Sequence, residues 1–209
     1  MNYNEIIEKC IPYTMVGRDR LMANIVSVEK IVRDGVVGDV VEIGVCAGGS
    51  MMAMMYALSE LRDYRRVFLY DTFDGMTEPE ACDVSHAGDS ANEMILVEPK
   101  MCFSSLESVV RNVGLVGYPN ELITYVKGDI LQNSEFPEKI SILRLDTDWY
   151  KSTKYELENF GYLVTDGGVI MVDDYGHWDG ARKAVDEYVL DRNFKIVPID
   201  YTGVYLERI

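Results

Sequence analysis

Short apolar segments alternate with longer segments of mixed polar and apolar residues along most of this chain. The apolar segments are rich in Val, Ile and Leu and have strand length, which is typical of buried strands in a parallel sheet. We predict strands at residues 39–45, 67–71, 122–126, 140–146, 168–173, 194–198 and 203–207. We predict helices in the mixed segments at residues 49–61, 104–113, 152–163 and 180–191. This alternation indicates βαβ units.

The end of the chain departs from the alternation. Only residues 199–202 separate the last two predicted strands, and so short a link predicts an antiparallel hairpin at one edge of the sheet. We therefore predict an α/β, Rossmann-like fold: a seven-stranded, mostly parallel sheet with one antiparallel strand and helices on both faces. A length of 209 residues suits a single domain over residues 1–209.

Two regions lie outside the alternation. Residues 1–38 mix polar and apolar positions and are predicted to be mostly helical. Residues 77–100 are rich in acids and small residues and have no clear periodicity. Long irregular insertions in compact domains are more often lids or binding loops than spacers, so we expect residues 77–100 to border a site.

The charge of the chain limits its partners. There are 35 acidic and 20 basic residues, a formal net charge of −15, which argues against nucleic acid and anionic membranes because both require clustered Lys and Arg. We see no signal-peptide pattern and no apolar segment of membrane-spanning length, so neither export nor membrane insertion is predicted. The four cysteines form no C-x-x-C pair, and the expected compartment is the reducing cytoplasm.

Pairs of acids follow two of the predicted strands. Asp146 and Asp148 end the strand at residues 140–146, and Asp173 and Asp174 end the strand at residues 168–173. Neighbouring parallel strands would bring all four carboxylates to one edge of the sheet, where they repel one another unless a divalent cation or protons are shared. Hard oxygen ligands select Mg²⁺, Mn²⁺ or Ca²⁺. The alternative is that Asp148 and Asp174 cap the helices that follow.

A glycine turn follows the first predicted strand. Glu42 and Gly44 lead into Gly48 and Gly49 at the start of a helix, and Asp71 ends the next strand, where Rossmann-like folds bind ribose hydroxyls. The spacing is not G-x-G-x-x-G, and Glu42 would repel a pyrophosphate. An acid there suits a ligand with a positive centre, such as the sulfonium or amino group of S-adenosylmethionine. The alternative is an ordinary turn that binds no ligand.

Several motifs in order also resemble those of one known family, the macrocin O-methyltransferases. They cover about residues 13–190 and comprise Tyr13-Thr14-Met15, Val41–Val45 with Gly48-Gly49-Ser50, Tyr70–Met76, Leu145–Thr153, Gly167–Tyr175 and Ala184–Glu187. The resemblance implies a class I methyltransferase fold and an enzyme that uses S-adenosyl-L-methionine and Mg²⁺, with Mn²⁺ as a substitute, to methylate sugar hydroxyls.

The resemblance also assigns roles to residues at the metal. Asp146, Asp173 and Asp174 become the metal ligands, and Asp148 becomes the general base that removes the proton of the sugar hydroxyl. The expected acceptor is a sugar or glycoside with a vicinal diol, such as a deoxyhexose like rhamnose in a glycan or glycoside. Chelation of both hydroxyls by the metal would stabilise the alkoxide and align it with the methyl group.

The cofactor site is assigned in the same way. Asp71 is placed on the ribose and Asp129 near the adenine, while residues 1–38 form a lid over the cofactor. The full set of implied cofactor-binding residues is Thr14, Met15, Glu42, Gly44, Ser50, Asp71, Asp129 and Asp146. Lids in this family often contact a neighbouring subunit, which leaves a homo-oligomer open.

Three other functions compete with this one. A metal-dependent nucleotide-sugar glycosyltransferase also carries an Asp-x-Asp after an apolar strand, as in Asp146-Thr147-Asp148. A non-catalytic nucleotide- or metal-binding module needs fewer acids, and a catechol methyltransferase needs a flat aromatic slot. Among the aromatic residues, Trp149 suits either sugar stacking or the core, and the methionines at residues 51–55 suit an adaptable core.

Overall fold

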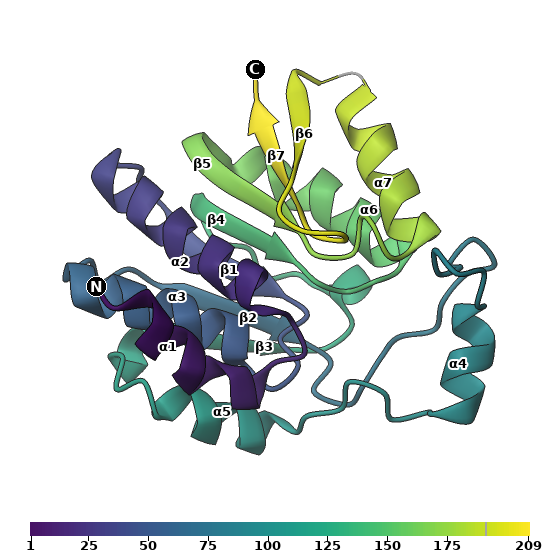
Figure 1. Cartoon of the computed structure of the whole chain (residues 1–209), viewed down its shortest axis with the longest axis horizontal. Coiled ribbons are helices and arrows are strands. Elements are labelled where there is room, and N and C mark those ends of the chain that lie inside the picture. Colours follow the sequence, from purple (N-terminus) through teal and green to yellow (C-terminus); the bar gives the residue numbers. More distant parts are fainter. Residues whose placement is uncertain (191) are drawn as a thin grey trace.

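The computed structural model describes residues 1–190 and 192–209 and contains one seven-stranded sheet (Figure 1). The spatial order is β3-β2-β1-β4-β5-β7-β6, and β7 runs antiparallel to both β5 and β6. The strands are β1 (Asp39–Ile43), β2 (Val67–Asp71), β3 (Ile123–Lys127), β4 (Ile140–Leu145), β5 (Val164–Val172), β6 (Phe194–Pro198) and β7 (Val204–Arg208). The predicted sheet, with its one reversed strand in a terminal hairpin, is confirmed.

Helices cover both faces of this sheet (Figure 1). The α-helices are α1 (Tyr3–Cys10), α2 (Arg18–Arg33), α3 (Gly49–Leu61), α4 (Ala91–Val97), α5 (Leu106–Gly114), α6 (Tyr150–Asn159) and α7 (Asp179–Leu190). Single 3-10 turns occupy η1 (Ile11–Tyr13), η2 (Asn120–Leu122), η3 (Ile130–Gln132) and η4 (Gly161–Leu163).

Several predicted boundaries differ from the structure: β1 ends at Ile43 instead of residue 45, and β5 begins at Val164 instead of residue 168. The helix predicted at residues 152–163 begins two residues earlier and is replaced at its end by η4. The predicted end of the last helix, residue 191, lies outside the described residues. Residues 77–100 are irregular for the most part but also contain α4, a single short helix without the apolar repeat that would reveal it.

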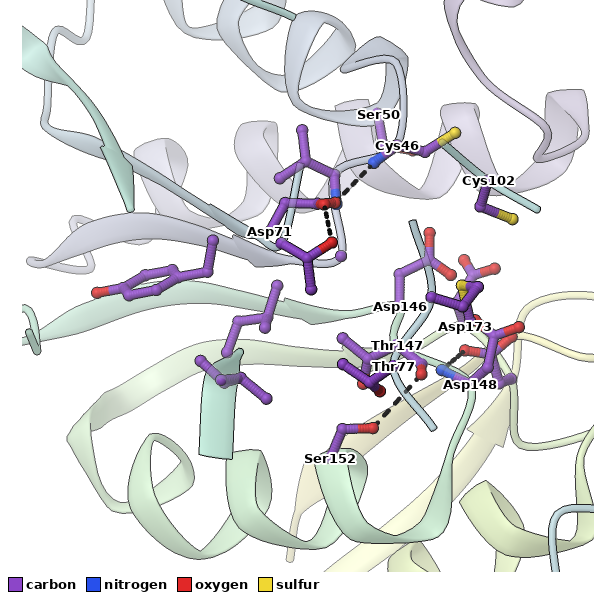
Figure 2. A pocket seen from close by; sticks show the side chains of 18 of the residues that line it. Cys46, Ser50, Asp71, Thr77, Cys102, Asp146, Thr147, Asp148, Ser152 and Asp173 are labelled. Atoms are coloured by element: carbon purple, nitrogen blue, oxygen red, sulfur yellow. Dashed lines mark hydrogen bonds between the residues drawn. The ribbon is translucent and has the colours of Figure 1, made fainter. Parts of the chain in front are cut away.

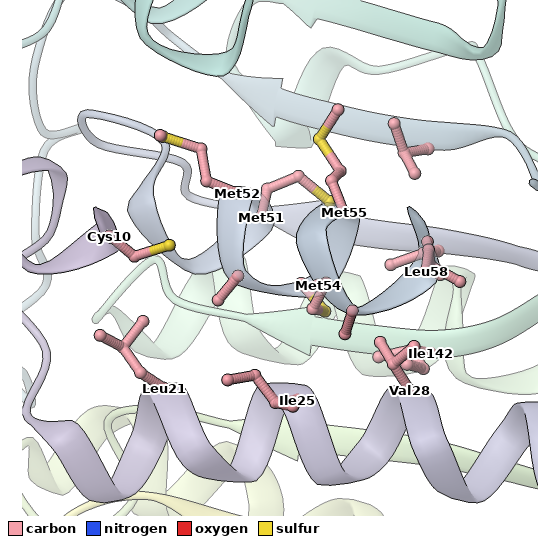
Figure 3. Close-up of a cluster of buried hydrophobic side chains, with 14 of the residues drawn as sticks. Cys10, Leu21, Ile25, Val28, Met51, Met52, Met54, Met55, Leu58 and Ile142 are labelled. Atoms are coloured by element: carbon pink, nitrogen blue, oxygen red, sulfur yellow. The ribbon is translucent and has the colours of Figure 1, made fainter. Parts of the chain in front are cut away.

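Alternating strand residues form the two halves of the core. In β1, Val40 packs with α2 and α3, whereas Val41 and Ile43 face the opposite side with α6 and α7, as the period of two in a strand requires. The helix α3 packs beside α2 on one face of the sheet, with Met51, Met52, Met54 and Met55 fully buried (Figure 3). The methionine run is therefore core, as predicted, because flexible thioethers fill the space between two packed layers.

The register of the parallel strands defines where the site lies. Ile43 of β1 pairs with Leu145 of β4, and Leu145 pairs with Val172 of β5. Three strands thus end at the same level, and the residues after them share one edge of the sheet. This edge carries the glycine turn and both pairs of acids.

Candidate active site

A cleft with about 1040 Å³ of empty space, its open mouth included, lies over the carboxyl ends of the central strands. Thr14 and Met15 reach it from the N-terminal region, as the lid prediction expects, and Ser50 comes from the start of α3. Figure 2 shows Asp71 and Cys46 on one side of the cleft and Asp146, Asp148 and Asp173 on the other. The remaining acid, Asp174, also lines the cleft.

The glycine turn is shaped by contacts within the protein. Gly44 has φ +84°, and a Cβ there would lie 1.9 Å from the backbone oxygen of Asp146. A Cβ at Gly49 would lie 2.7 Å from both Thr14 Cβ and the Tyr13 oxygen. Gly44 was expected to let a ligand approach the backbone. In the structure, the absence of a side chain at Gly44 makes room for the backbone of Asp146, and its absence at Gly49 makes room for the N-terminal segment.

Asp71 joins the end of β2 to the glycine turn. Its Oδ2 accepts hydrogen bonds from the backbone N–H of Val45 (2.7 Å) and Cys46 (3.1 Å), and its Oδ1 accepts one from Phe73 (2.7 Å). Burial raises the pKa of Asp71, while the three backbone donors oppose that rise. The carboxylate thus holds the glycine turn in place and also lines the cleft.

Three acids converge across the cleft from Asp71. One carboxylate oxygen from each of Asp146, Asp148 and Asp174 lies within 4.8 Å of the others. The strand β4 ends at Leu145, and a turn with φ +68° at Asp148 brings its carboxylate to the other two. The Asp148 N–H donates to Asp174 Oδ2 at 3.1 Å. Burial, followed by the charges of neighbouring acids, raises the pKa of Asp148 and of Asp174 well above its usual range.

Asp173 lies apart from these three, in a buried cluster of opposite charges. Arg144 is 1% exposed and donates to Glu42 Oε1 (2.9 Å), Asp146 Oδ2 (2.7 Å) and Asp173 Oδ1 (2.5 Å). Arg20 forms a second ion pair with Asp173 and another with Asp200. A carboxylate held by two guanidiniums is neutralised without a metal, so the predicted ligand set and the observed group of three share only Asp146 and Asp174.

The predicted position of Glu42 in the cofactor site is corrected by the structure. The acid was expected to meet the positive centre of the cofactor, but it is fully buried beneath the cleft and its partner is Arg144. Burial raises the pKa of Glu42 to about 8, and the charge of Arg144 opposes that rise. Glu42 can therefore influence the cleft only through Arg144 and the acids that Arg144 holds.

The helix-capping alternative fails for Asp148. The N-cap position of α6 is Trp149, and the first N–H of the helix, that of Tyr150, donates to Asp83 Oδ1 at 2.8 Å. The Asp148 carboxylate instead accepts a hydrogen bond from Trp178 Nε1 at 3.0 Å. Asp129 is the acid that does cap, because its side chain accepts from Leu131 N–H at the start of η3.

The loop around Asp129 touches the cleft through its neighbours. Gly128 and Ile130 line the cleft, while the Asp129 side chain is occupied by its own turn. Trp149 is 1% exposed and packs edge to face against Trp178, with ring centroids 4.9 Å apart. Of the two roles open to Trp149, the structure supports the core and not a stacking surface for a sugar.

Sequence reasoning missed four residues beside the site: Arg20, Asp83, Arg144 and Glu156. Only Arg144 carried a usable signal, since an arginine inside an otherwise apolar strand must find buried acids. Glu156 is fully buried on α6, and its Oε1 accepts from Thr147 Oγ1 at 2.8 Å. Its Oε2 has no partner within the described part of the chain.

Glu156 predicts a dependence of stability on pH. Burial raises its pKa from 4.5 to about 8, so between these values the folded state holds a proton that the unfolded state has lost. Stability from this group is complete below pH 4.5 and decreases as the pH rises to 8, by up to about 1.4 kcal/mol per pH unit. We expect Glu156→Gln to remove this contribution, and so to reduce the overall slope in urea unfolding measured from pH 5 to 8, while the other buried acids keep theirs. An unchanged slope would show that Glu156 is ionised when folded.

The fold and the cleft together define a class I methyltransferase. The chain belongs to the macrocin O-methyltransferase family: the family model "Macrocin-O-methyltransferase (TylF)" matches residues 9–208. It is therefore an O-methyltransferase, for which S-adenosylmethionine is the methyl donor. Within the described residues, no helix has both the length and the apolarity that crossing a membrane requires.

Named relatives and a solved structure agree with this assignment. The 8-demethyl-8-(2,3-dimethoxy-alpha-L-rhamnosyl)-tetracenomycin-C 4'-O-methyltransferase of Streptomyces olivaceus is 37% identical over 202 residues, 93% of this chain and 75% of that enzyme. The mycinamicin III 3''-O-methyltransferase of Micromonospora griseorubida is 33% identical over 209 residues, 95% of this chain and 79% of that enzyme. The O-methyltransferase NovP superposes with a TM-score of 0.82 at 31% identity, covering 94% of this chain and 82% of NovP. These relatives leave the glycosyltransferase alternative without support.

Proposed function

We propose that this enzyme transfers a methyl group from S-adenosylmethionine to a hydroxyl of a deoxyhexose such as rhamnose, with a divalent cation bound beside the acceptor. The observation that carries the proposal is the group Asp146, Asp148 and Asp174, which gathers three carboxylates on the lining of the cleft. A relative whose name specifies a rhamnosyl group supports a sugar acceptor. Four free cysteines suit a cytoplasmic enzyme.

The donor chemistry of the site suits Mg²⁺ or Mn²⁺. All three acids offer hard oxygens. Burial and then the charges of neighbouring acids raise the pKa of Asp148 and Asp174, and a bound cation would favour the ionised carboxylates. We assign Asp146 and Asp174 as ligands, whereas Asp173, both of whose oxygens are held by Arg144 and Arg20, supports the site from beside it. Bound there, a divalent ion would lower the pKa of a ligated sugar hydroxyl and bind its vicinal neighbour.

Asp148 is the base in this proposal. It lies next to the ligands, and the hydrogen bond from Trp178 Nε1 to its Oδ2 fixes the orientation of its carboxylate. The other oxygen of Asp148 remains available to take the proton of the acceptor hydroxyl as the methyl group is transferred. Arg144 holds Asp146 and Asp173 in place from below, so the acids keep their positions before any ion binds.

Calorimetric titration tests the class of ligand. S-adenosylmethionine, UDP-sugars and GDP-sugars are titrated separately into the protein, with and without Mg²⁺. We expect S-adenosylmethionine to bind whether or not the metal is present, because Asp71 and the glycine turn lie across the cleft from the acids. Binding of a nucleotide sugar that depends on the metal would contradict the proposal and restore the Asp-x-Asp alternative.

The cofactor side of the cleft predicts a second binding result. Asp71→Ala should weaken the binding of S-adenosylmethionine by about 1–3 kcal/mol, because it removes a charged acceptor for the ribose and loosens the turn at Val45 and Cys46. Calorimetry measures the change, with Asp74→Ala, an exposed acid of the same loop, as the control. An affinity equal to that of the wild type would place the ribose elsewhere.

A further inference from the structure

The segment at residues 77–91 is fastened to both loops that carry the acids. Trp149 Nε1 donates to the Thr77 oxygen at 3.0 Å, which ties the start of the segment to the residue after Asp148. Ser85 forms a β-bridge with Trp178, and the backbone N–H of His86 donates to the His177 oxygen at 2.7 Å. The base of the segment is therefore built into the site, whereas α4 lies at the margin of the molecule (Figure 1).

Asp83 is the central contact of this attachment. The side chain is 1% exposed, and both of its oxygens are used: Oδ1 accepts from Tyr150 N–H at 2.8 Å and Oδ2 from Glu80 N–H at 2.7 Å. A buried carboxylate at the first N–H of α6 interacts favourably with the positive end of that helix. Asp83 thus supplies the cap that no residue of the loop at residues 146–149 supplies among the described residues.

The start of α7 is also shaped around this carboxylate. A Cβ at Gly180 would lie 1.8 Å from Asp83 Oδ1 and 3.0 Å from its Cγ. Gly180 lies in the first turn of α7, where alanine is the better helix former, so the glycine is there to leave room for Asp83. One side chain therefore contacts the first turns of the two helices that follow the acid-bearing strands.

We propose that Asp83 is a positioning residue: by capping α6 against Gly180 of α7, it holds the Asp146–Asp148 turn in its metal-binding shape and fixes residues 77–91 beside the site. The inference rests on the proposed function only through the metal. Removal of the cap frees the first turn of α6, and Asp148 lies two residues before that helix begins. The cofactor side of the cleft, built from β1 and β2, makes no use of Asp83 within the described residues.

The test compares Mn²⁺ binding with S-adenosylhomocysteine binding, each measured alone by calorimetry. Asp83→Ala should weaken Mn²⁺ by about 10-fold, the lower end of the effect of a partner outside the ligands, and leave S-adenosylhomocysteine unchanged. Glu78→Ala, an exposed acid of the same segment, is the control. Equal loss of both ligands, or loss of neither, would overturn the positioning role. If the wild type binds no Mn²⁺, the proposed function is refuted instead. The role of Asp83 is then tested by the proteolysis experiment described next.

The second test uses Gly180→Ala, which disturbs the contact between Asp83 and α7 from the α7 side. It should make chymotrypsin cleave faster at Leu96 and Phe103, both exposed, because the displaced Asp83 releases the segment. In an Asp83→Ala background the added methyl group meets only Tyr150 Cβ, at 3.1 Å, so Gly180→Ala should have a much smaller further effect on cleavage than it has alone. Additive effects, or no effect of Gly180→Ala alone, would overturn the inference. If Asp83→Ala does not fold, Asp83→Ser replaces it in the cycle, since the shorter side chain removes the oxygen that the added methyl group would meet and keeps one acceptor oxygen.

Discussion

Asp148→Asn is expected to lower kcat for methyl transfer by about 10²- to 10⁴-fold, the usual contribution of a general base. The amide keeps the size of the side chain and can still accept the hydrogen bond of Trp178 Nε1, but it cannot take a proton. The binding of S-adenosylmethionine and of Mn²⁺ should remain close to that of the wild type. Turnover and both affinities are measured on the same preparation.

The metal measurement in this variant separates two roles for Asp148. Its carboxylate lies in the group with Asp146 and Asp174, so the geometry also allows it to be a ligand. A base leaves Mn²⁺ binding intact when it is replaced, whereas a ligand does not. Glu158→Gln, the same chemical change on the exposed face of α6, controls for effects of charge. Full activity of Asp148→Asn would remove the base assignment.

Asp174→Ala should abolish Mn²⁺ binding and turnover together. The change removes a buried metal ligand. It also removes the acceptor of the Asp148 N–H, which holds the turn beside the metal in place. Replacing residues outside the ligands typically lowers metal affinity by 10–100-fold, and we expect loss of a ligand to exceed about 100-fold. Calorimetry with Mn²⁺ and a methyl-transfer assay check the two halves of this prediction.

The control for that variant lies five residues on in the same loop. Asp179 is exposed at the start of α7, and Asp179→Ala should retain both metal binding and activity. The wild type should lose activity in EDTA and regain it with Mg²⁺ or Mn²⁺. Activity that EDTA does not reduce would refute the role of the metal, whatever the result for Asp174→Ala.

The positions of the strands could be predicted from the sequence because most of them contain short, largely apolar segments. The bounds predicted for β2 and β6 match those observed, and the acids after β4 and β5 do meet at one edge. Parallel register alone brings them there, so no knowledge of side-chain conformations is needed. The glycine turn was placed at the cleft because it follows a strand, whereas Thr14 and Met15 were placed there by the family resemblance.

The pairing of charges within the site could not be predicted in this way. Which acid contacts which arginine depends on the turn at Asp148 and on the long side chains of Arg20 and Arg144, and neither follows from spacing. The capping role of Asp83 could not be predicted from the sequence for a different reason. Its partners Tyr150 and Gly180 are far along the chain, and a cap that comes from a distant segment leaves no local capping pattern.

The most direct test of the account is methyl transfer from isotopically labelled S-adenosylmethionine to rhamnosides, followed by mass spectrometry. One acceptor has a free vicinal diol, and its matched analogue has one of the two hydroxyls removed; each is assayed with Mg²⁺ and with EDTA. The account predicts one labelled methyl group on the diol acceptor with Mg²⁺, and none with EDTA or on the analogue. Equal labelling of both acceptors in EDTA would contradict it.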